Sequence, residues 1–410
     1  MHAYFLGNVS EFLSWKIWGH KEKSKNYPQS FAPLRLCVIV FIFICFVLSP
    51  VLAQQARQPW WYTLEQGKSY FRSGSYGDAL IAFEDARWGR QAQFTRFEQD
   101  FILLLSKPEV RRLGDSLEYV ERYITERHET AAAAALAELY HRVPKAALKD
   151  SVSEALKELE RLKNYPEAEY WLGETYRAEG ELGMALRQYE RALNNRALLE
   201  TPGFDVNILY RITDIYRIRG NYPEMEKRAK EIIEGTGPDG LPRDSLWTGP
   251  GSSQIRSAMA RILENEGVNR FLTLYRHNNT ATERAHRLLG FFYYATSRYI
   301  PAVEHLTIAF LIQNSVLIED LLRRDFDFSF ESLENLIALA GSRREISAFI
   351  EETEYYRTIY YLSSALYATG KSRPSSQLWS FLAGSKNAGE WGERARRNPS
   401  PHIERPLEMP

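Results

Sequence analysis

The sequence predicts an all-α protein built from stacked antiparallel helix hairpins. Two observations favour this fold class. Small and aromatic residues recur at fixed positions of a unit of about 34 residues, and the apolar residues within each unit have the spacing of amphipathic helices. One hairpin alone exposes too much apolar surface to be stable, whereas stacked hairpins bury it between them. We therefore expect an extended array along most of the 410 residues.

The clearest unit spans residues 166–199 and is interpreted as two helices joined by a tight turn at Gly180. Gly173 in the first helix and Ala185 in the second put little or no side chain between the helices, so the two backbones are expected to approach closely there. The intervals before this unit, 95–127 and 129–164, are broken near prolines and keep only the rhythm of the hairpin. We interpret both as degenerate hairpins of the same stack.

This pattern resembles the tetratricopeptide repeat, in which small and aromatic residues occupy fixed positions of two packed helices. The matching positions of the central unit are Gly173, Tyr176, Gly180, Ala185, Tyr189 and Ala192. The unit departs from the family pattern at Glu169 and Ala197. Further matching units begin at Trp60, Val206, Glu283 and Tyr356. The resemblance implies a right-handed superhelix of hairpins that serves as a binding scaffold.

The units group into an N-terminal array over residues 54–233 and a C-terminal array over residues 254–389. Between them, residues 234–253 hold five glycines and three prolines and cannot continue a helix. We interpret this segment as a surface loop or hinge; the alternative is a functional lid that carries Trp247. Residues 390–410 are expected to form a disordered tail.

Residues 1–53 have the character of a signal peptide or a membrane anchor. The uncharged, largely apolar run 36–53 follows five positive residues and ends in the kind of sequence that a signal peptidase reads. Cleavage would start the mature chain at Gln54, whereas the uncleaved run is just long enough to anchor the protein in a bilayer. Both alternatives place the remainder outside the cytoplasm, in the periplasm or exported. Membrane contact is expected only through residues 36–53, if they are retained.

The cysteine content agrees with export. Cys37 and Cys45 are the only cysteines and both lie in the apolar run, so the exported part would have no disulfide and no thiolate chemistry. A lipoprotein signal is disfavoured, because Ile44 stands before Cys45 where that signal takes a small residue. Without residues 1–53 the chain is slightly acidic, which argues against nucleic acid as a partner.

No catalytic or metal-binding pattern stands out. The sequence Gly370-Lys371-Ser372 resembles the end of a phosphate-binding loop, but Ala365 stands where that loop needs a glycine, and we interpret it as a turn between helices. The histidines outside the leader lack the spacing of metal ligands; they are His128, His141, His277, His286, His305 and His402. We therefore expect a non-enzymatic protein without metal or cofactor.

The resemblance also implies a binding groove, because the first helix of every tetratricopeptide hairpin lines the concave face. Tyrosine and arginine recur at its groove positions, and both residue types are enriched at interface hot spots. The candidate partner-binding residues are Tyr170, Glu174, Arg177, Tyr210, Asp214, Arg217, Arg287, Phe291, Tyr294, Tyr360 and Tyr367. The alternative for Tyr170, Tyr210 and Tyr360 is that they pack against the next hairpin.

We therefore expect an exported scaffold that binds a partner protein or an extended peptide and supports assembly of an envelope complex. One alternative is a structural building block of a large periplasmic machine, such as a secretion, pilus or flagellar-motor accessory. Another is the helical accessory domain of a glycan-active enzyme.

Overall fold

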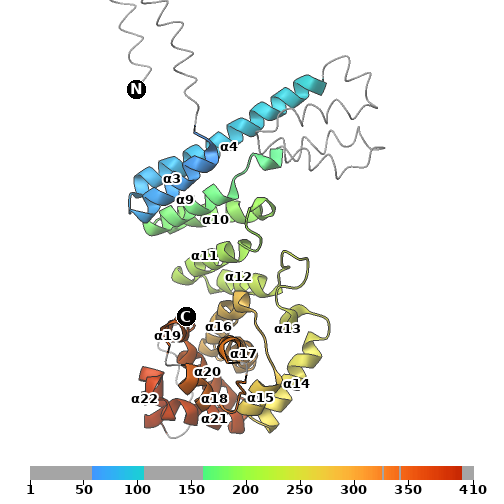
Figure 1. Cartoon of the computed structure of the whole chain (residues 1–410), viewed down its shortest axis with the longest axis vertical. Coiled ribbons are helices and arrows are strands. Elements are labelled where there is room, and N and C mark those ends of the chain that lie inside the picture. Colours follow the sequence, from blue (N-terminus) through green and yellow to red (C-terminus); the bar gives the residue numbers. More distant parts are fainter. Residues whose placement is uncertain (1–57, 106–159, 326, 341–342, 399–410) are drawn as a thin grey trace, which may run out of the picture. The chain divides into compact units, whose positions relative to one another are not determined.

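The computed structural model describes residues 58–105, 160–325, 327–340 and 343–398 (Figure 1). These ranges are built from helices, with no β-strand among them and one isolated antiparallel bridge between Thr236 and Pro242. The expectation of an all-α protein is confirmed for this part of the chain. The apolar run 36–53 lies outside the described residues, as does most of the region assigned to degenerate hairpins.

Five helix hairpins begin at, or within three residues of, the five predicted units. Their helices are α3 (Trp60–Arg72) with α4 (Tyr76–Leu105), α9 (Pro166–Ala178) with α10 (Leu182–Asn194), α11 (Asp205–Ile218) with α12 (Tyr222–Glu234), α16 (Thr280–Ala295) with α17 (Tyr299–Arg324), and α20 (Tyr355–Ala368) with α21 (Ser372–Gly384). The two helices of each pair pack along one another, and α10 packs on α11, α12 on α16, and α17 on α20.

A left-handed residue ends the first helix of every hairpin. Four of these residues are glycines with φ between 68° and 83°: Gly74, Gly180, Gly220 and Gly370. Ser297 has φ 60° in the corresponding turn between α16 and α17. The backbone N–H after this residue donates to a carbonyl five residues earlier, as from Glu181 to Tyr176 at 2.8 Å. This bond pairs a carbonyl that the helix end would otherwise leave free.

The predicted close approach at Gly173 is present. A Cβ atom on Gly173 would lie 2.6 Å from Cε1 of Tyr189, which is fully buried on α10. The same relation recurs between Gly67 and Phe83, where the distance would be 2.5 Å. The spacing that recurs in these two units therefore has a steric cause, since the aromatic ring of the second helix fills the space over the glycine of the first.

Shorter elements connect and extend the hairpins. Between α12 and α16 lie α13 (Ser245–Thr248), α14 (Ser252–Asn265) and α15 (Val268–Leu274). Between α17 and α20 lie α18 (Leu333–Ala340) and α19 (Arg344–Glu352).

The end of the described chain corrects one expectation. Residues 390–410 are predicted to be a disordered tail, but Gly389–Arg397 form helix α22. Its Trp391 ring lies 5.2 Å from the ring of Tyr360, and Ala395 is buried. A helix with many arginines forms here because its few apolar residues all face the core.

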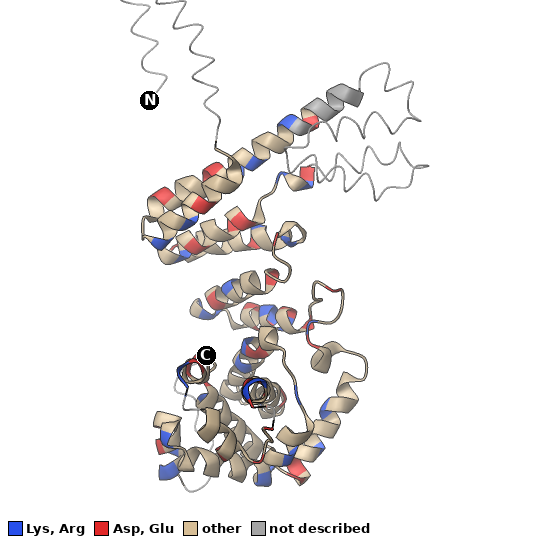
Figure 2. Ribbon diagram, viewed as in Figure 1, with Lys and Arg blue, Asp and Glu red and all other residues tan. Residues whose placement is uncertain are grey.

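Helix α17 is the one described helix long and apolar enough to cross a membrane. In the structure, 78% of its most apolar window is buried against other helices. Such burial is typical of a core helix, which can have the same length and composition as a helix that crosses a membrane. Positive and negative side chains are interspersed over the described helices (Figure 2).

Candidate functional site

The groove residues of α9 and α11 meet residues of the neighbouring hairpins. The Glu174 carboxylate accepts hydrogen bonds from the Tyr189 hydroxyl and from Arg177, and Arg211 of α11 pairs with it at 2.8 Å. The side chain of Glu174 is almost fully buried. This carboxylate therefore ties α9 to α10 and α11 instead of facing an open surface.

A second set of contacts ties α11 to α16. Asp214 accepts hydrogen bonds from Arg284 at 2.6 and 2.8 Å. The Arg284 guanidinium also lies over the Tyr210 ring, 5.0 Å from its centroid. The Tyr210 hydroxyl donates to the carbonyl of Ala281 at 2.8 Å. Tyr210 and Asp214 thus hold the two hairpins together.

Arg287 holds the hairpin of α16 to that of α20. It donates to Glu283 at 3.1 Å and pairs with Glu354, the residue that precedes α20. The amide of Gln313 on α17 donates to Glu283 at 2.7 Å. Glu283 is buried, and burial raises its pKa, with the Arg287 charge opposing that shift.

The remaining candidate partner-binding residues differ in the solvent exposure of their side chains. Tyr170, Phe291, Tyr294 and Tyr360 are buried among other rings, so they cannot contact a partner without displacing the core. Packing against the next hairpin, the alternative for Tyr170, Tyr210 and Tyr360, describes the contacts of Tyr170 with Phe204 and of Tyr210 with Ala281. Tyr360 instead packs against Trp379 of its own hairpin and Trp391 of α22. Arg177, Arg217 and Tyr367 keep the most exposed side chains, at 37%, 39% and 44%.

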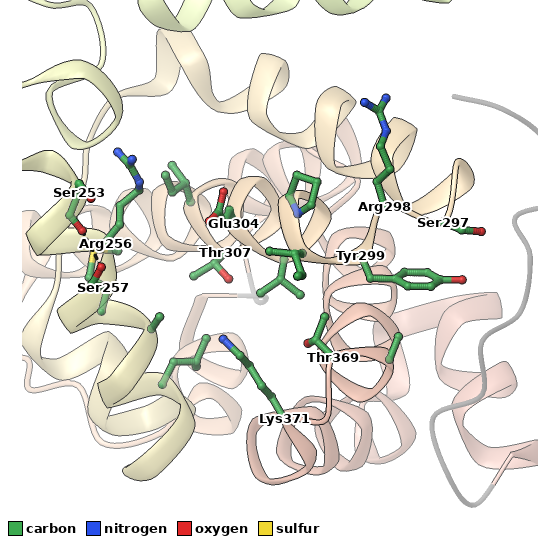
Figure 3. A pocket seen from close by; sticks show the side chains of 18 residues that line it. Ser253, Arg256, Ser257, Ser297, Arg298, Tyr299, Glu304, Thr307, Thr369 and Lys371 are labelled. Atoms are coloured by element: carbon green, nitrogen blue, oxygen red, sulfur yellow. Dashed lines mark hydrogen bonds between the residues drawn. The ribbon is translucent and has the colours of Figure 1, made fainter.

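The structure also contains a cleft of about 870 Å³ that the sequence does not predict (Figure 3). Its walls come from α14, from the first turns of α17, and from the turn between α20 and α21. Apolar side chains form much of its lining: Met259, Leu263, Ile300, Pro301, Val303 and Ile308. The volume is within the range of sites that hold small ligands or peptide segments. Ile300, at the start of α17, is 70% exposed, which is unusual for an isoleucine.

Three cations and one carboxylate, Glu304, lie in the cleft wall. Arg298 is paired with Glu226 at 3.1 Å, and its side chain extends away from the others in Figure 3. Lys371 extends from the turn toward α14, where its Nζ lies 3.9 Å from Glu264 at the limit of an ion pair. Two of the three cations thus have a carboxylate partner, and the Lys371 charge is only loosely neutralised.

Arg256 is the third cation, and no described carboxylate lies within ion-pair distance of it. Its guanidinium donates to the carbonyls of Leu246 and Trp247 at 2.7 and 2.8 Å, and lies 4.6 Å from the centre of the Trp247 ring. These contacts fix its position but leave its charge uncompensated. Carbonyl and ring contacts place this positive charge at one wall of the cleft.

The strap, defined here as residues 235–251, is held on the hairpins by the buried Asp244. One carboxylate oxygen accepts from the N–H groups of Leu246 and Trp247 and lies 3.2 Å from Nε2 of His277. The other lies 2.8 Å from the Thr282 hydroxyl and 3.1 Å from Nε2 of His286. Five groups thus satisfy one carboxylate in the core, as a buried charge requires.

A chain of imidazoles continues from Asp244. Because Nε2 of His286 donates to the carboxylate, its Nδ1 is an acceptor when the ring is neutral, and Nδ1 of His305 lies 2.9 Å from it. The Trp247 ring lies against His305, with centroids 4.2 Å apart, and against Arg256. The Asp244 cluster, defined as Asp244, His277, His286 and His305, therefore positions the strap and, through Trp247, the cleft cation Arg256.

The pKa shifts in this cluster follow from burial and hydrogen bonding. Burial alone would raise the pKa of Asp244, but hydrogen bonds from His277 and His286 outweigh it and hold that pKa well below its usual range. Burial lowers the pKa of His286, and the Asp244 carboxylate opposes that change. Burial and the neighbouring His286 lower the pKa of His305 strongly. Near pH 7 the Asp244 carboxylate is thus ionised, and the imidazoles of His286 and His305 are neutral.

The sequence gives little indication of this cluster, because its members are separated by dozens of residues without a motif. The one indication from the sequence is the alternative interpretation of residues 234–253 as a functional lid that carries Trp247. Among the described residues, no group of three or more acidic, histidine or cysteine side chains has the geometry of a metal site.

No protein-family model matches the chain. An uncharacterized protein of Treponema pallidum (strain Nichols) is 24% identical over 337 residues, which cover 82% of this chain and 88% of the relative. An uncharacterized protein of Borreliella burgdorferi (strain ATCC 35210) is 19% identical over 218 residues, or 50% of this chain and 66% of the relative. The similarity to the first relative extends over most of both chains.

Proposed function

We propose that this chain is a non-enzymatic scaffold of tetratricopeptide-like hairpins, exported to the cell envelope, that binds an extended peptide or a partner protein in the cleft. The observation that carries the proposal is the combination of an apolar lining with two cations, Arg256 and Lys371, whose charges are not fully neutralised. Apolar area supplies affinity, and fixed charges at its edge supply orientation.

Rigidity of the walls supports this function. The ion pairs between successive hairpins and the Asp244 cluster hold α14, α16 and α17 in place before a ligand arrives. A preformed site loses less conformational entropy on binding than a flexible one. In the envelope, such a scaffold would hold a segment of one component in place while a complex assembles around it.

The experiment compares two exposed positions on the same helix. Ile300 lines the cleft, whereas Leu322, 43% exposed, lies near the other end of α17, about 33 Å away at 1.5 Å per residue. Cells expressing the chain are treated with a cross-linker and the complexes are purified from the envelope. Ile300→Asp should remove a stoichiometric partner that Leu322→Asp retains. Equal recovery with both variants would refute binding in the cleft.

A second candidate, a building block of a large envelope structure, is favoured by the first hairpin. Trp61, Ile81 and Trp88 on α3 and α4 are 55%, 63% and 57% exposed, and large exposed apolar residues often mark protein interfaces. In the same cross-linking experiment, this function predicts adducts between copies of the chain that Trp61→Ser and Trp88→Ser abolish and Ile300→Asp does not.

A further inference from the structure

The cleft has a candidate occupant within the same chain. Residues 399–410, PSPHIERPLEMP, follow α22 and lie outside the described residues. The segment carries three apolar side chains, Ile403, Leu407 and Met409, and the carboxylates of Glu404 and Glu408 against one arginine. This composition is complementary to an apolar cleft whose wall bears the cations Arg256 and Lys371.

Asn398, the last described residue before the segment, is held on α21. The carbonyl of Asn398 accepts a hydrogen bond from Nε1 of Trp379 on α21 at 2.8 Å. Lys371, in the cleft wall, precedes Trp379 by eight residues, or about 12 Å along the helix. Twelve extended residues span up to about 40 Å, so the segment is long enough to enter the cleft and lie along it.

We propose that the cleft binds the chain's own segment 399–410, with Ile403 and Leu407 on its apolar lining and Glu404 and Glu408 facing Arg256 and Lys371. The proposal rests on the proposed function, because a partner that uses the same cleft must displace the segment. The segment would then compete with a partner for the cleft.

Two physical factors favour binding within one chain. Four of the twelve residues are prolines, which restrict the backbone in the free segment, so less entropy is lost on binding. A short tether also raises the effective concentration of the segment to about the millimolar range, so that a weak intrinsic affinity is enough to fill the cleft. A partner with a longer or better matched segment can still compete at lower concentration.

Disulfide trapping in the full chain tests the proposal. With Cys37 and Cys45 replaced by Ser, Leu407→Cys is combined either with Ile300→Cys in the cleft or with Leu322→Cys on the same helix. In dilute protein under mild oxidation, the Ile300→Cys pair should form an intramolecular disulfide roughly tenfold faster than the Leu322→Cys pair, as judged by non-reducing electrophoresis. Equal rates, or a disulfide that joins two chains, would overturn the proposal.

Charge reversal supplies the second test. Lys371→Glu should slow the Ile300→Cys pair, and adding Glu404→Lys and Glu408→Lys should restore the rate, whereas no effect of these changes would refute the assigned charge contacts. The result of the trapping experiments can be distinguished from the result of the partner experiment. Loss of a partner on Ile300→Asp together with equal trapping rates would leave the cleft as a partner site and remove the segment as its occupant.

Discussion

Asp244 and His286 are 42 residues apart in the sequence, yet Oδ2 of Asp244 lies 3.1 Å from Nε2 of His286, and both side chains are fully buried. This contact joins the glycine- and proline-rich strap to the first helix of a hairpin. It explains why a segment with the composition of a loop has a fixed place over α16 and α17. The cleft cation Arg256 depends on the same contact, because it is held by the strap residues Leu246 and Trp247.

Asp244→Asn should lower the free energy of unfolding by about 2–4 kcal/mol, since an amide has one oxygen to accept the hydrogen bonds that two carboxylate oxygens accept now. Urea unfolding of the variant gives the value. Asp239→Asn is the matched control, because Asp239 is in the same strap but exposed, and accepts one backbone hydrogen bond. A similar loss in both variants would show that the strap is not held by Asp244.

His305 should make stability fall on acidification. Its folded pKa is lowered by burial and by His286, so the folded state takes up fewer protons than the unfolded state below the unfolded pKa of about 6.5. The contribution of His305 is thus largest above pH 6.5 and decreases by up to about 1.4 kcal/mol per pH unit below it. His305→Gln should be less stable than the parent at pH 7.5, and this difference should shrink by pH 5.5. A constant difference between these pH values would contradict the assignment.

Gly173→Ala should destabilise the fold by about 1–3 kcal/mol, because the added Cβ would lie 2.6 Å from the Tyr189 ring. Thermal unfolding measures the effect. The control is Gly77→Ala in α4, where a Cβ meets nothing within 4 Å and the better helix propensity of alanine should raise the melting temperature. Equal melting temperatures for parent and Gly173→Ala would show that α9 and α10 do not meet at this position.

Ser297→Gly should stabilise the protein by about 0.5–1 kcal/mol, because serine is held at φ 60° where the other four hairpins have glycine. The reverse change, Gly180→Ser, has no steric neighbour within 4 Å and should cost a similar amount through the backbone alone. Chemical unfolding of the two variants provides the comparison. Opposite signs are expected, and a loss of stability in both would mean that the Ser297 side chain has a stabilising contact.

The hairpins could be predicted from the sequence because their determinants are local. The pairing of Gly173 with Tyr189, and the left-handed turn at Gly180, repeat at nearly constant spacing, so one unit identifies the others. The spacing within one unit also predicts on which side of the first helix each groove residue lies. Whether Glu174 or Asp214 faces solvent depended on Arg211 and Arg284 of the neighbouring hairpin, which the pattern of one unit does not contain.

The cleft and the Asp244 cluster depend on contacts between distant segments. The walls of the cleft come from α14, α17 and the turn at Lys371, and α14 belongs to a region without the repeat pattern. Helix α22 was missed for a similar reason, because Trp391 is an isolated apolar residue until Tyr360 and Tyr361 are placed beside it. From its composition alone, that segment is predicted to be part of a disordered tail.

The most direct measurement of the central claim is site-specific photo-cross-linking from the cleft in living cells. A photoreactive amino acid at Ile300 should give a defined adduct, either with one partner or within the chain to residues 399–410, and mass spectrometry identifies which. The same amino acid at Leu322 should give neither adduct. If Ile300 and Leu322 yield the same pattern, or if Ile300 yields no adduct while the chain is folded and present in the envelope, the cleft is not a binding site.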